Sequence, residues 1–173
     1  MMSDPHGRAS SAHSTVRIDD ESLVAVFDAL DSINALIEAC NDGEFGCRVG
    51  AEHARSTALR QALVLRADEY RAAADRLRAH VLHLGATPED GGSTAGAMRR
   101  GWMLLRGRLA ALDDEAILQD CETEETSTQA ALREALERPL PAATRGLLEQ
   151  LQARADVSAA PMHRLAEALD ALA

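Results

Sequence analysis

The most constraining feature of this sequence is an apolar seam at helical spacing in its first third. Its members recur at alternating steps of three and four residues: Leu30, Ile33, Ile37, Cys40, Glu44, Cys47 and Ala51. This spacing places them on one stripe of an α-helix that must pack against other helices. Glu44 interrupts the stripe, and a carboxylate among apolar side chains needs a cation, a metal ion or a proton. The seam therefore predicts a helical bundle with a desolvated acid.

The composition indicates a single all-α domain. A chain of 173 residues is long enough for one domain with a sizeable core. Apolar residues make up 46% of the chain and aromatic residues only 2%, and the dominance of Ala and Leu favours helices over strands. The formal net charge of -10 would repel nucleic acids and anionic membrane surfaces, so we expect neither as a partner.

Cysteine usage and hydropathy bear on the compartment. The three cysteines form no CxxC pair, which fits a reducing environment and a cytoplasmic location better than a disulfide framework. A run of about 18 apolar residues is absent, so no membrane-spanning segment is expected. The first residues also lack the apolar stretch of a secretory signal.

Cap signals and apolar seams predict four long helices. Their expected limits are Asp19, Asp20 or Ser22 to about Arg55, Ser56 or Thr57 to Leu84 with Gly85 as C-cap, Asp113 or Asp114 to the residue before Pro139, and Pro141 to Leu172. Gly43 and Gly46 disfavour a helix interior by up to about 1 kcal/mol each relative to Ala, so the first helix either breaks there or keeps them for a function. Pro161 should kink the last helix near Val157 or Ser158.

The connection between the second and third helices is long enough to carry its own structure. A turn cluster at residues 87–92 precedes a short amphipathic helix over residues 97–109, whose Trp102 should be buried against the bundle. Two short connections and one long crossover are the layout of a ferritin-like four-helix bundle rather than of a simple up-down bundle. We expect residues 19–173 to form this bundle and residues 1–18 to be a disordered tail.

A family resemblance supports this layout. It is carried by Leu36 to Gly46, by Leu84-Gly85 with Pro88-Glu89, by Gly92 to Ala97 with Arg100-Gly101-Trp102, and by Asp120-Cys121-Glu122 with Glu125. In their order and separations these strings resemble an uncharacterised bacterial family of ferritin-like four-helix-bundle proteins, a domain of unknown function. The resemblance covers roughly residues 22–173. It implies the ferritin-like fold and a bacterial cytoplasmic setting, and it brings no established activity.

The resemblance raises the question of a carboxylate metal site in the core. Ferritin-like di-iron sites draw one Glu from each of two helices and a Glu-x-x-His pair from each of the other two. Glu44 and Glu125 fit the single-Glu positions, but the second helix has no Glu-x-x-His. The family tends to place a His-Asp pair near Met162 and His163, so the histidine here is displaced by one residue, about 100° around the helix. A complete di-iron site is therefore not expected.

Two interpretations of the seam carboxylates stay open. In the first, an incomplete site holds iron or manganese through Glu44, Glu125, Glu122 and His163. In the second, the core carboxylates are neutralised by nearby groups, the candidates being Arg66, Arg76, Tyr70 and Thr128. If Glu44 and Glu125 faced each other without a metal or an arginine, one of them would have to keep a proton.

The cysteines and histidines have mainly structural interpretations. The three cysteines lie in apolar seams, where a free thiol packs as a small hydrophobe and its pKa rises. His80 and His83 could hold a surface metal with Asp75 or Glu89, but their place in the last turn of the second helix favours a capping role.

No motif for nucleophilic catalysis, phosphate binding or zinc hydrolysis is present, so no catalytic or cofactor-binding residue is predicted. The leading hypothesis is a non-enzymatic ferritin-like bundle that acts as a structural or interaction module without a cofactor, as a homo-oligomer or with a protein partner. The rival hypothesis is an iron- or manganese-binding or redox protein that uses Glu44, Glu125 and Glu122, with His163 swung inward by the kink at Pro161.

Overall fold

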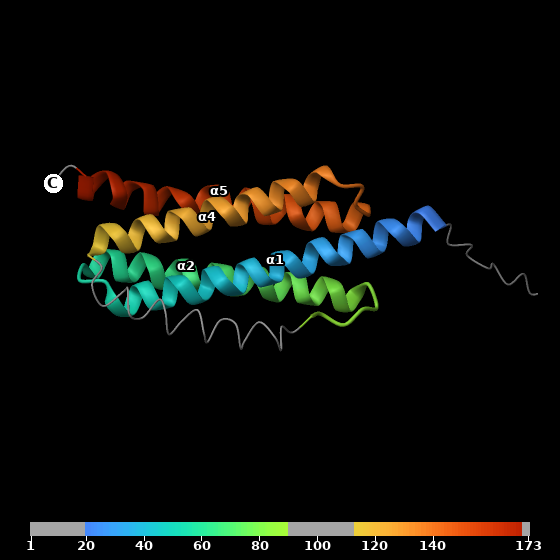
Figure 1. The fold of residues 1–173 in the computed structure, drawn as a ribbon, viewed down its shortest axis with the longest axis horizontal. Coiled ribbons are helices and arrows are strands. Elements are labelled where there is room, and N and C mark those ends of the chain that lie inside the picture. The colour runs from blue at the N-terminus through green and yellow to red at the C-terminus, as the bar shows by residue number, and fades with distance from the viewer. Residues whose placement is uncertain (1–19, 90–112, 171–173) are drawn as a thin grey trace, which may run out of the picture.

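The computed structural model describes residues 20–89 and 113–170, which form four α-helices and no strand. The helices are α1 (Asp20–His53), α2 (Thr57–His83), α4 (Asp114–Glu137) and α5 (Ala142–Asp170), which Figure 1 colours from blue to red. These bounds confirm the all-α prediction and the four expected helices. The last of them, α5, runs through Pro161.

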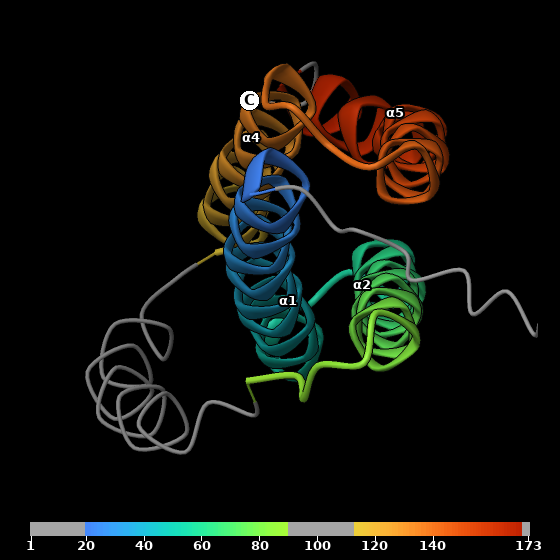
Figure 2. The same cartoon turned by 90° about the vertical axis from the view of Figure 1, so that its right-hand side faces the viewer.

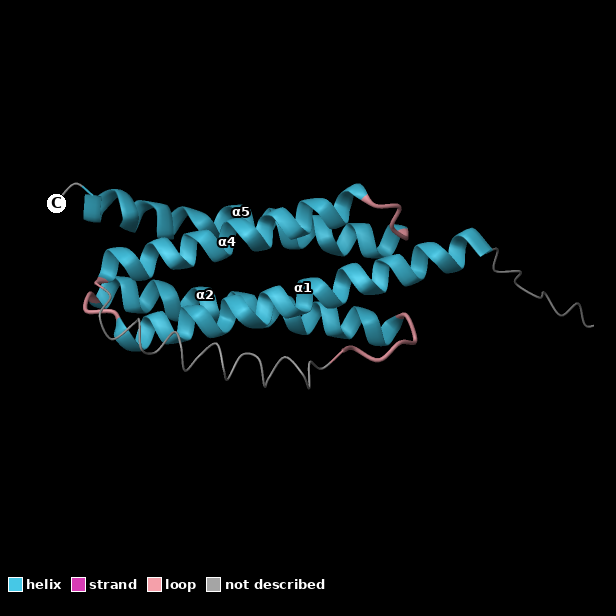
Figure 3. Ribbon diagram, viewed as in Figure 1, coloured by secondary structure: helices cyan, strands magenta, loops and turns pink. Residues whose placement is uncertain are grey.

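The helices form two antiparallel pairs (Figures 1 and 3). A short turn at residues 54–56 joins α1 to α2, and residues 138–141 join α4 to α5. Because α2 and α4 run in the same direction, the end of α2 and the start of α4 lie at opposite ends of the bundle. The predicted crossover helix with Trp102 and the predicted tail at residues 1–18 lie outside the described residues.

The four helices do not pack equally tightly. Figure 2 shows them end on, with α1 between α4 and α2 and with α5 beside α4. The α1–α2 interface is the most extensive, α1 also packs on α4, and α4 packs on α5, whereas α2 and α5 meet along the most sparsely packed seam. The cavity described below lies along that seam.

The core follows the predicted seams. On α1 the seam members Ile33, Ile37, Cys40, Cys47 and Ala51 are buried. They pack with buried residues of the other helices: Leu59, Leu63, Leu77, Val81, Ile117, Leu118, Leu132, Leu148 and Leu151. Each fully buried Leu or Ile contributes about 1.5 to 3 kcal/mol, so these stripes hold the bundle together. Within residues 20–89 and 113–170, no helix is long and apolar enough to cross a bilayer.

The helix ends carry the capping groups that the sequence predicts. The Ser56 hydroxyl accepts a hydrogen bond from the Leu59 amide, and the Asp113 carboxylate accepts one from the Ala116 amide at 3.0 Å. Gly85 follows α2 with a φ of 79°, a conformation that favours glycine. The Asp114 carboxylate also accepts from the amides of Arg55 and Ser56, both at 2.7 Å, and so fixes the start of α4 on the α1–α2 turn.

The glycines of α1 do not break the helix, and one of them has a clear packing role. A Cβ atom on Gly43 would lie 2.7 Å from Cζ of Tyr70, so only glycine lets the Tyr70 ring of α2 approach the α1 backbone. A Cβ on Gly50 would lie 2.9 Å from Cγ2 of Ile117 on α4. A Cβ on Gly46 would meet nothing within 4 Å. Close helix packing thus explains Gly43 and Gly50, but not Gly46.

Candidate functional site

Glu125 and Arg66 form a buried ion pair across the interior of the bundle. Each is 7% exposed. Nη2 of Arg66 on α2 donates to Oε1 of Glu125 on α4 at 2.7 Å, and Nη1 donates to Oε2 of Glu69 at 3.0 Å. Burial would lower the pKa of Arg66, but Tyr70 and the two carboxylates outweigh it and raise that pKa. Glu125 is thus a buried carboxylate with an arginine as its partner, as the second interpretation of the seam acids expects.

Glu44 has a different environment from Glu125. Its side chain is 18% exposed at the α1–α2 interface, and its Oε1 accepts from Nε of Arg48 at 3.0 Å and from Nε of Arg71 at 2.9 Å. Burial would raise the pKa of Glu44, but the hydrogen bonds from Arg71 and Arg48 outweigh it and lower the pKa. The expectation that Arg66 or Arg76 would be the partner of Glu44 is wrong, because this edge of α1 faces the outer arginines of α2.

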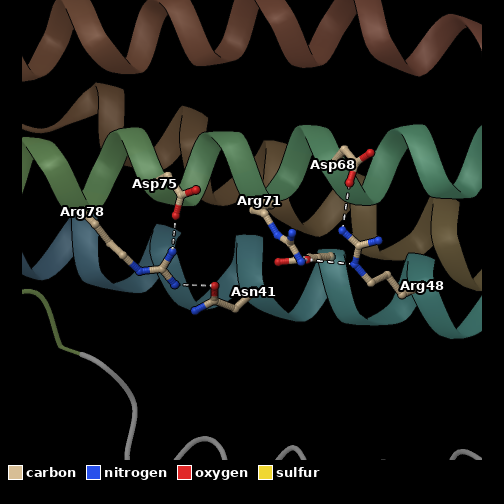
Figure 4. Close-up of polar contacts among 7 residues, drawn as sticks. Asn41, Arg48, Asp68, Arg71, Asp75 and Arg78 are labelled. Atoms are coloured by element: carbon tan, nitrogen blue, oxygen red, sulfur yellow. Dashed lines mark hydrogen bonds and ion pairs between the residues drawn. The ribbon is translucent and has the colours of Figure 1, made fainter.

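These contacts continue along the α1–α2 interface as a row of polar side chains (Figure 4). Nη2 of Arg48 donates to Asp68 at 2.9 Å. Further along, Arg78 donates to Asn41 at 2.7 Å and to Asp75 at 3.0 Å. Exposed pairs of this kind are worth about 1 kcal/mol or less each. The row therefore links α1 to α2, and its described members are Arg, Asp, Asn and Glu side chains that bond to one another.

The four candidate metal ligands are not brought into one described site. Glu44 and Glu125 bind different arginines, Glu122 is half-buried on α4, and His163 lies in α5 with a side chain outside the described part of the structure. Among the residues that are described, no three His, Cys, Asp or Glu side chains converge as a metal-binding group would require. The donor set that remains does not fit a ferritin-like di-metal centre.

The cysteines pack in the core as free thiols. Burial raises the pKa of Cys40 to about 11. Cys47 of α1 and Cys121 of α4 share a hydrogen bond, which favours the thiolate at Cys47 and the thiol at Cys121, so the pKa of Cys47 falls and that of Cys121 rises. The cysteines thus pack as small groups, but the expected rise in pKa holds only for Cys40 and Cys121 and is wrong for Cys47.

His80 makes a structural contact between α2 and α5. Its Nε2 lies 2.9 Å from Oγ1 of Thr144, a residue with 0% exposure. Burial and the neighbouring His83 lower the pKa of His80. The neutral imidazole thus bonds a buried hydroxyl of the next helix.

A cavity of about 130 Å³ lies between the four helices, next to the Arg66–Glu125 pair. Apolar side chains such as Leu36, Leu77, Leu132 and Leu151 form most of its wall. Two buried polar atoms belong to residues that line it: the Tyr70 hydroxyl, which neighbours the Thr128 hydroxyl, and Nε of Arg66, for which no described residue offers a hydrogen-bond partner. The Arg66 guanidinium stacks 4.6 Å from the centre of the Tyr70 ring, so the two groups are held side by side.

The cavity reaches the surface through the α2–α5 seam, which two polar bridges hold together. Nη2 of Arg76 donates to Oε1 of Gln150 at 2.7 Å, and the Ser158 hydroxyl donates to Oε1 of Glu69 at 2.9 Å. Small side chains line the opening between the two bridges: Ala72, Ala73 and Ala155. Sequence reasoning missed this cavity, although small residues facing each other on two helices are a signal that could have indicated it.

One family model matches the chain. It is described as a Domain of unknown function (DUF2383), and it matches residues 28–138, which include α1, α2 and α4 but not α5. The match confirms the resemblance at the level of a family of unknown function. No curated protein matches the chain.

Proposed function

Since the chain belongs to the DUF2383 family, a domain of unknown function, we propose that it is a ferritin-like bundle acting as a non-enzymatic structural or interaction module. One observation carries the proposal: the buried carboxylate Glu125 is neutralised by a guanidinium, Arg66, at 2.7 Å. The protein's own cation thus lies where a core carboxylate of a di-metal protein would face its metal.

The helix directions support the ferritin-like part of the proposal. An up-down-up-down bundle would place α4 antiparallel to α2, whereas these two helices are parallel. A parallel second and third helix is what a long crossover connection produces. The family resemblance adds a bacterial cytoplasmic setting to the proposal.

Electrostatics support the absence of a metal role. A divalent cation bound to Glu125 would lie beside the Arg66 guanidinium, and like charges in a low-dielectric interior repel strongly. Arg66 could withdraw only by breaking its contact with Glu69 as well, and its side chain is just 8% exposed. Glu44, held by two arginines, offers no substitute ligand.

Metal analysis tests this proposal directly. We expect wild-type protein purified without chelator to hold iron and manganese far below stoichiometry, and its Tm to be unaffected by either metal or by EDTA. Glu125→Gln should behave in the same way. Stoichiometric metal in the wild type that is lost from Glu125→Gln would overturn the proposal, and saturating metal would then raise stability by about 2.7 kcal/mol at a hundredfold excess over Kd. Light scattering on the same samples tests whether the protein forms a homo-oligomer.

A further inference from the structure

We propose that Cys47 of α1 and Cys121 of α4 form a reversible disulfide when the protein reacts with a hydroperoxide. The pair is then a modification site that links two helices of the bundle. It goes beyond the structural or interaction role proposed above and does not depend on it. Three observations carry the inference: the register of α1 on α4, the close approach of these helices beside the pair, and the contact between the two sulfurs.

The register of α1 on α4 places the two cysteines opposite each other. These helices pack side by side and run antiparallel (Figures 1 and 2). At one point of their interface the backbone of Gly50 faces the side chain of Ile117. Cys47 lies one turn before Gly50, and Cys121 lies one turn after Ile117. Because the helices are antiparallel, the two thiols come to the same level of the interface.

The two helices approach each other closely beside this pair. A Cβ atom on Gly50 would lie 2.9 Å from Cγ2 of Ile117 and 3.9 Å from Sγ of Cys121. The absence of a side chain at Gly50 therefore lets α4 come near the α1 backbone. A disulfide joins Cα atoms about 4.4 to 6.8 Å apart, a separation that directly facing residues of closely packed helices reach.

The sulfurs of the two cysteines are already in contact. They share a hydrogen bond in which Cys121 donates and Cys47 accepts. Rotation of the two side chains, without unfolding of either helix, can therefore close the bond. The third cysteine, Cys40, lies two turns from Cys47, or about 10 Å along the same helix. The folded chain thus offers Cys47 only one partner.

The surroundings of the pair favour Cys47 as the first thiol to react. The hydrogen bond from Cys121, helped by the charge of Arg66, lowers the pKa of Cys47 although burial opposes it. Cys47 is 4% exposed, whereas Cys121 is partly exposed. A molecule as small as hydrogen peroxide therefore reaches the pair from the side of Cys121.

The oxidation takes two balanced steps. The Cys47 sulfur attacks one oxygen of the hydroperoxide, the O–O bond breaks, and an alcohol, or water from hydrogen peroxide, leaves with the thiol proton. Cys47 is then a sulfenic acid. The Cys121 sulfur attacks the Cys47 sulfur, the S–S bond forms, and the S–O bond breaks to release water that carries the Cys121 proton. The two thiols supply the two electrons that reduce the peroxide.

The disulfide should stabilise the bundle. It closes a loop of about 70 residues that includes α2, and it fastens α1 to α4. Constraining the unfolded chain in this way should raise the Tm by about 4 to 16 °C relative to the reduced protein. A thiol reductant should reverse the change by exchange, and a resting dithiol agrees with the reducing environment that the cysteine usage favours.

Peptide mapping of the oxidised full chain tests the proposal. Reduced protein is treated with hydrogen peroxide, and its remaining thiols are alkylated under denaturing conditions. Cleavage after glutamate as well as arginine is needed, because Glu44 separates Cys40 from Cys47. We expect the loss of two hydrogens per chain, one cross-linked peptide pair that holds Cys47 and Cys121, and an alkylated Cys40. Dithiothreitol should restore three free thiols.

Cysteine variants test the order of the two steps. In Cys121→Ser, whose hydroxyl can still donate to Cys47, peroxide should add oxygen to Cys47 without forming a disulfide. In Cys47→Ser, Cys121 should stay reduced under the same conditions. Cys40→Ser is the matched control, and it should form the disulfide and gain the same Tm as the wild type.

The unfolded chain shows whether the fold selects the pair. In concentrated urea, oxidation should favour the Cys40–Cys47 pairing, because closing a short loop costs less entropy than closing a long one. The inference is overturned if native protein forms no disulfide, pairs Cys40, or forms cross-links only between chains. The same mixture of pairings in native buffer and in urea would overturn it as well. These outcomes are read from the wild type, so they stand even if a cysteine variant fails to fold.

Discussion

At the residue scale, burial decides how much each ion pair contributes. Arg66 and Glu125 are both buried, so losing one charge leaves the other desolvated and partly unpaired. Glu44 meets Arg48 and Arg71, whose side chains are 36% and 57% exposed, and water can replace the lost carboxylate there. Two glutamates in helical seams thus have different energetic roles.

This contrast gives a matched pair of mutations. We expect Glu125→Gln to lower the free energy of unfolding by about 2 to 4 kcal/mol, since Arg66 stays buried with only Glu69 as a charged partner. Glu44→Gln should cost about 1 kcal/mol or less. Urea unfolding of both variants beside the wild type measures the difference. Equal losses would contradict the assignment of Glu125, and not Glu44, as the core carboxylate.

His80 predicts a pH dependence of stability. Its pKa in the folded state is lowered from 6.5, so the unfolded state takes up a proton first as the pH falls. Its contribution is therefore intact above 6.5 and is lost progressively as the pH drops below that value. Unfolding free energies measured across this range should fall less steeply in His80→Gln than in the wild type. Identical slopes for His80→Gln and the wild type would refute this role.

At the element scale, the helices themselves could be predicted, but the reasons for their glycines could not. Ser56 and Asp113 cap helices where the sequence placed them, and Gly85 directly follows Leu84, the C-cap of α2, because capping depends on a residue and its chain neighbours. The role of Gly43 depends on Tyr70, which lies on another helix. No local pattern reports what lies opposite a glycine, so the sequence left a break in α1 as an alternative.

The glycines of α1 provide the test at this scale. Gly43→Ala gains up to about 1 kcal/mol of helix propensity but drives a methyl group against the Tyr70 ring, and overpacking costs about 1 to 3 kcal/mol. We expect a net loss of stability. Gly46→Ala meets open space and should gain about 0.5 to 1 kcal/mol. Thermal and urea unfolding would show opposite signs for the two variants, and stabilisation by Gly43→Ala would mean that the ring moves freely.

At the scale of the whole molecule, the sequence predicted the helical bundle better than it predicted which arginine pairs with which carboxylate. Periodicity identified the four stripes, and these stripes form the core. The partner of each seam carboxylate depends on the rotation of each helix about its axis, which spacing does not determine. Arg66 was one of several candidates for the seam acids, and only the packed helices show that it reaches Glu125, while Arg71 reaches Glu44.

The Arg66–Glu125 pair links α2 to α4. We expect that it favours one packing arrangement of the helices more than it raises the free energy of unfolding. Burying two charges costs several kcal/mol, and replacing both by apolar side chains of similar volume is often neutral or stabilising by about 1 to 4 kcal/mol. We therefore expect Arg66→Met/Glu125→Leu to be at least as stable as the wild type, and both single variants to be less stable. Urea unfolding of the four proteins forms a double-mutant cycle that measures the coupling. Amide NMR spectra of the double variant then reveal whether one arrangement persists: duplicated or broadened signals in a stable protein would show that the pair selects the arrangement. A double variant as unstable as the single ones would show instead that the pair supplies stability, and the bundle would then depend on its central charges to fold.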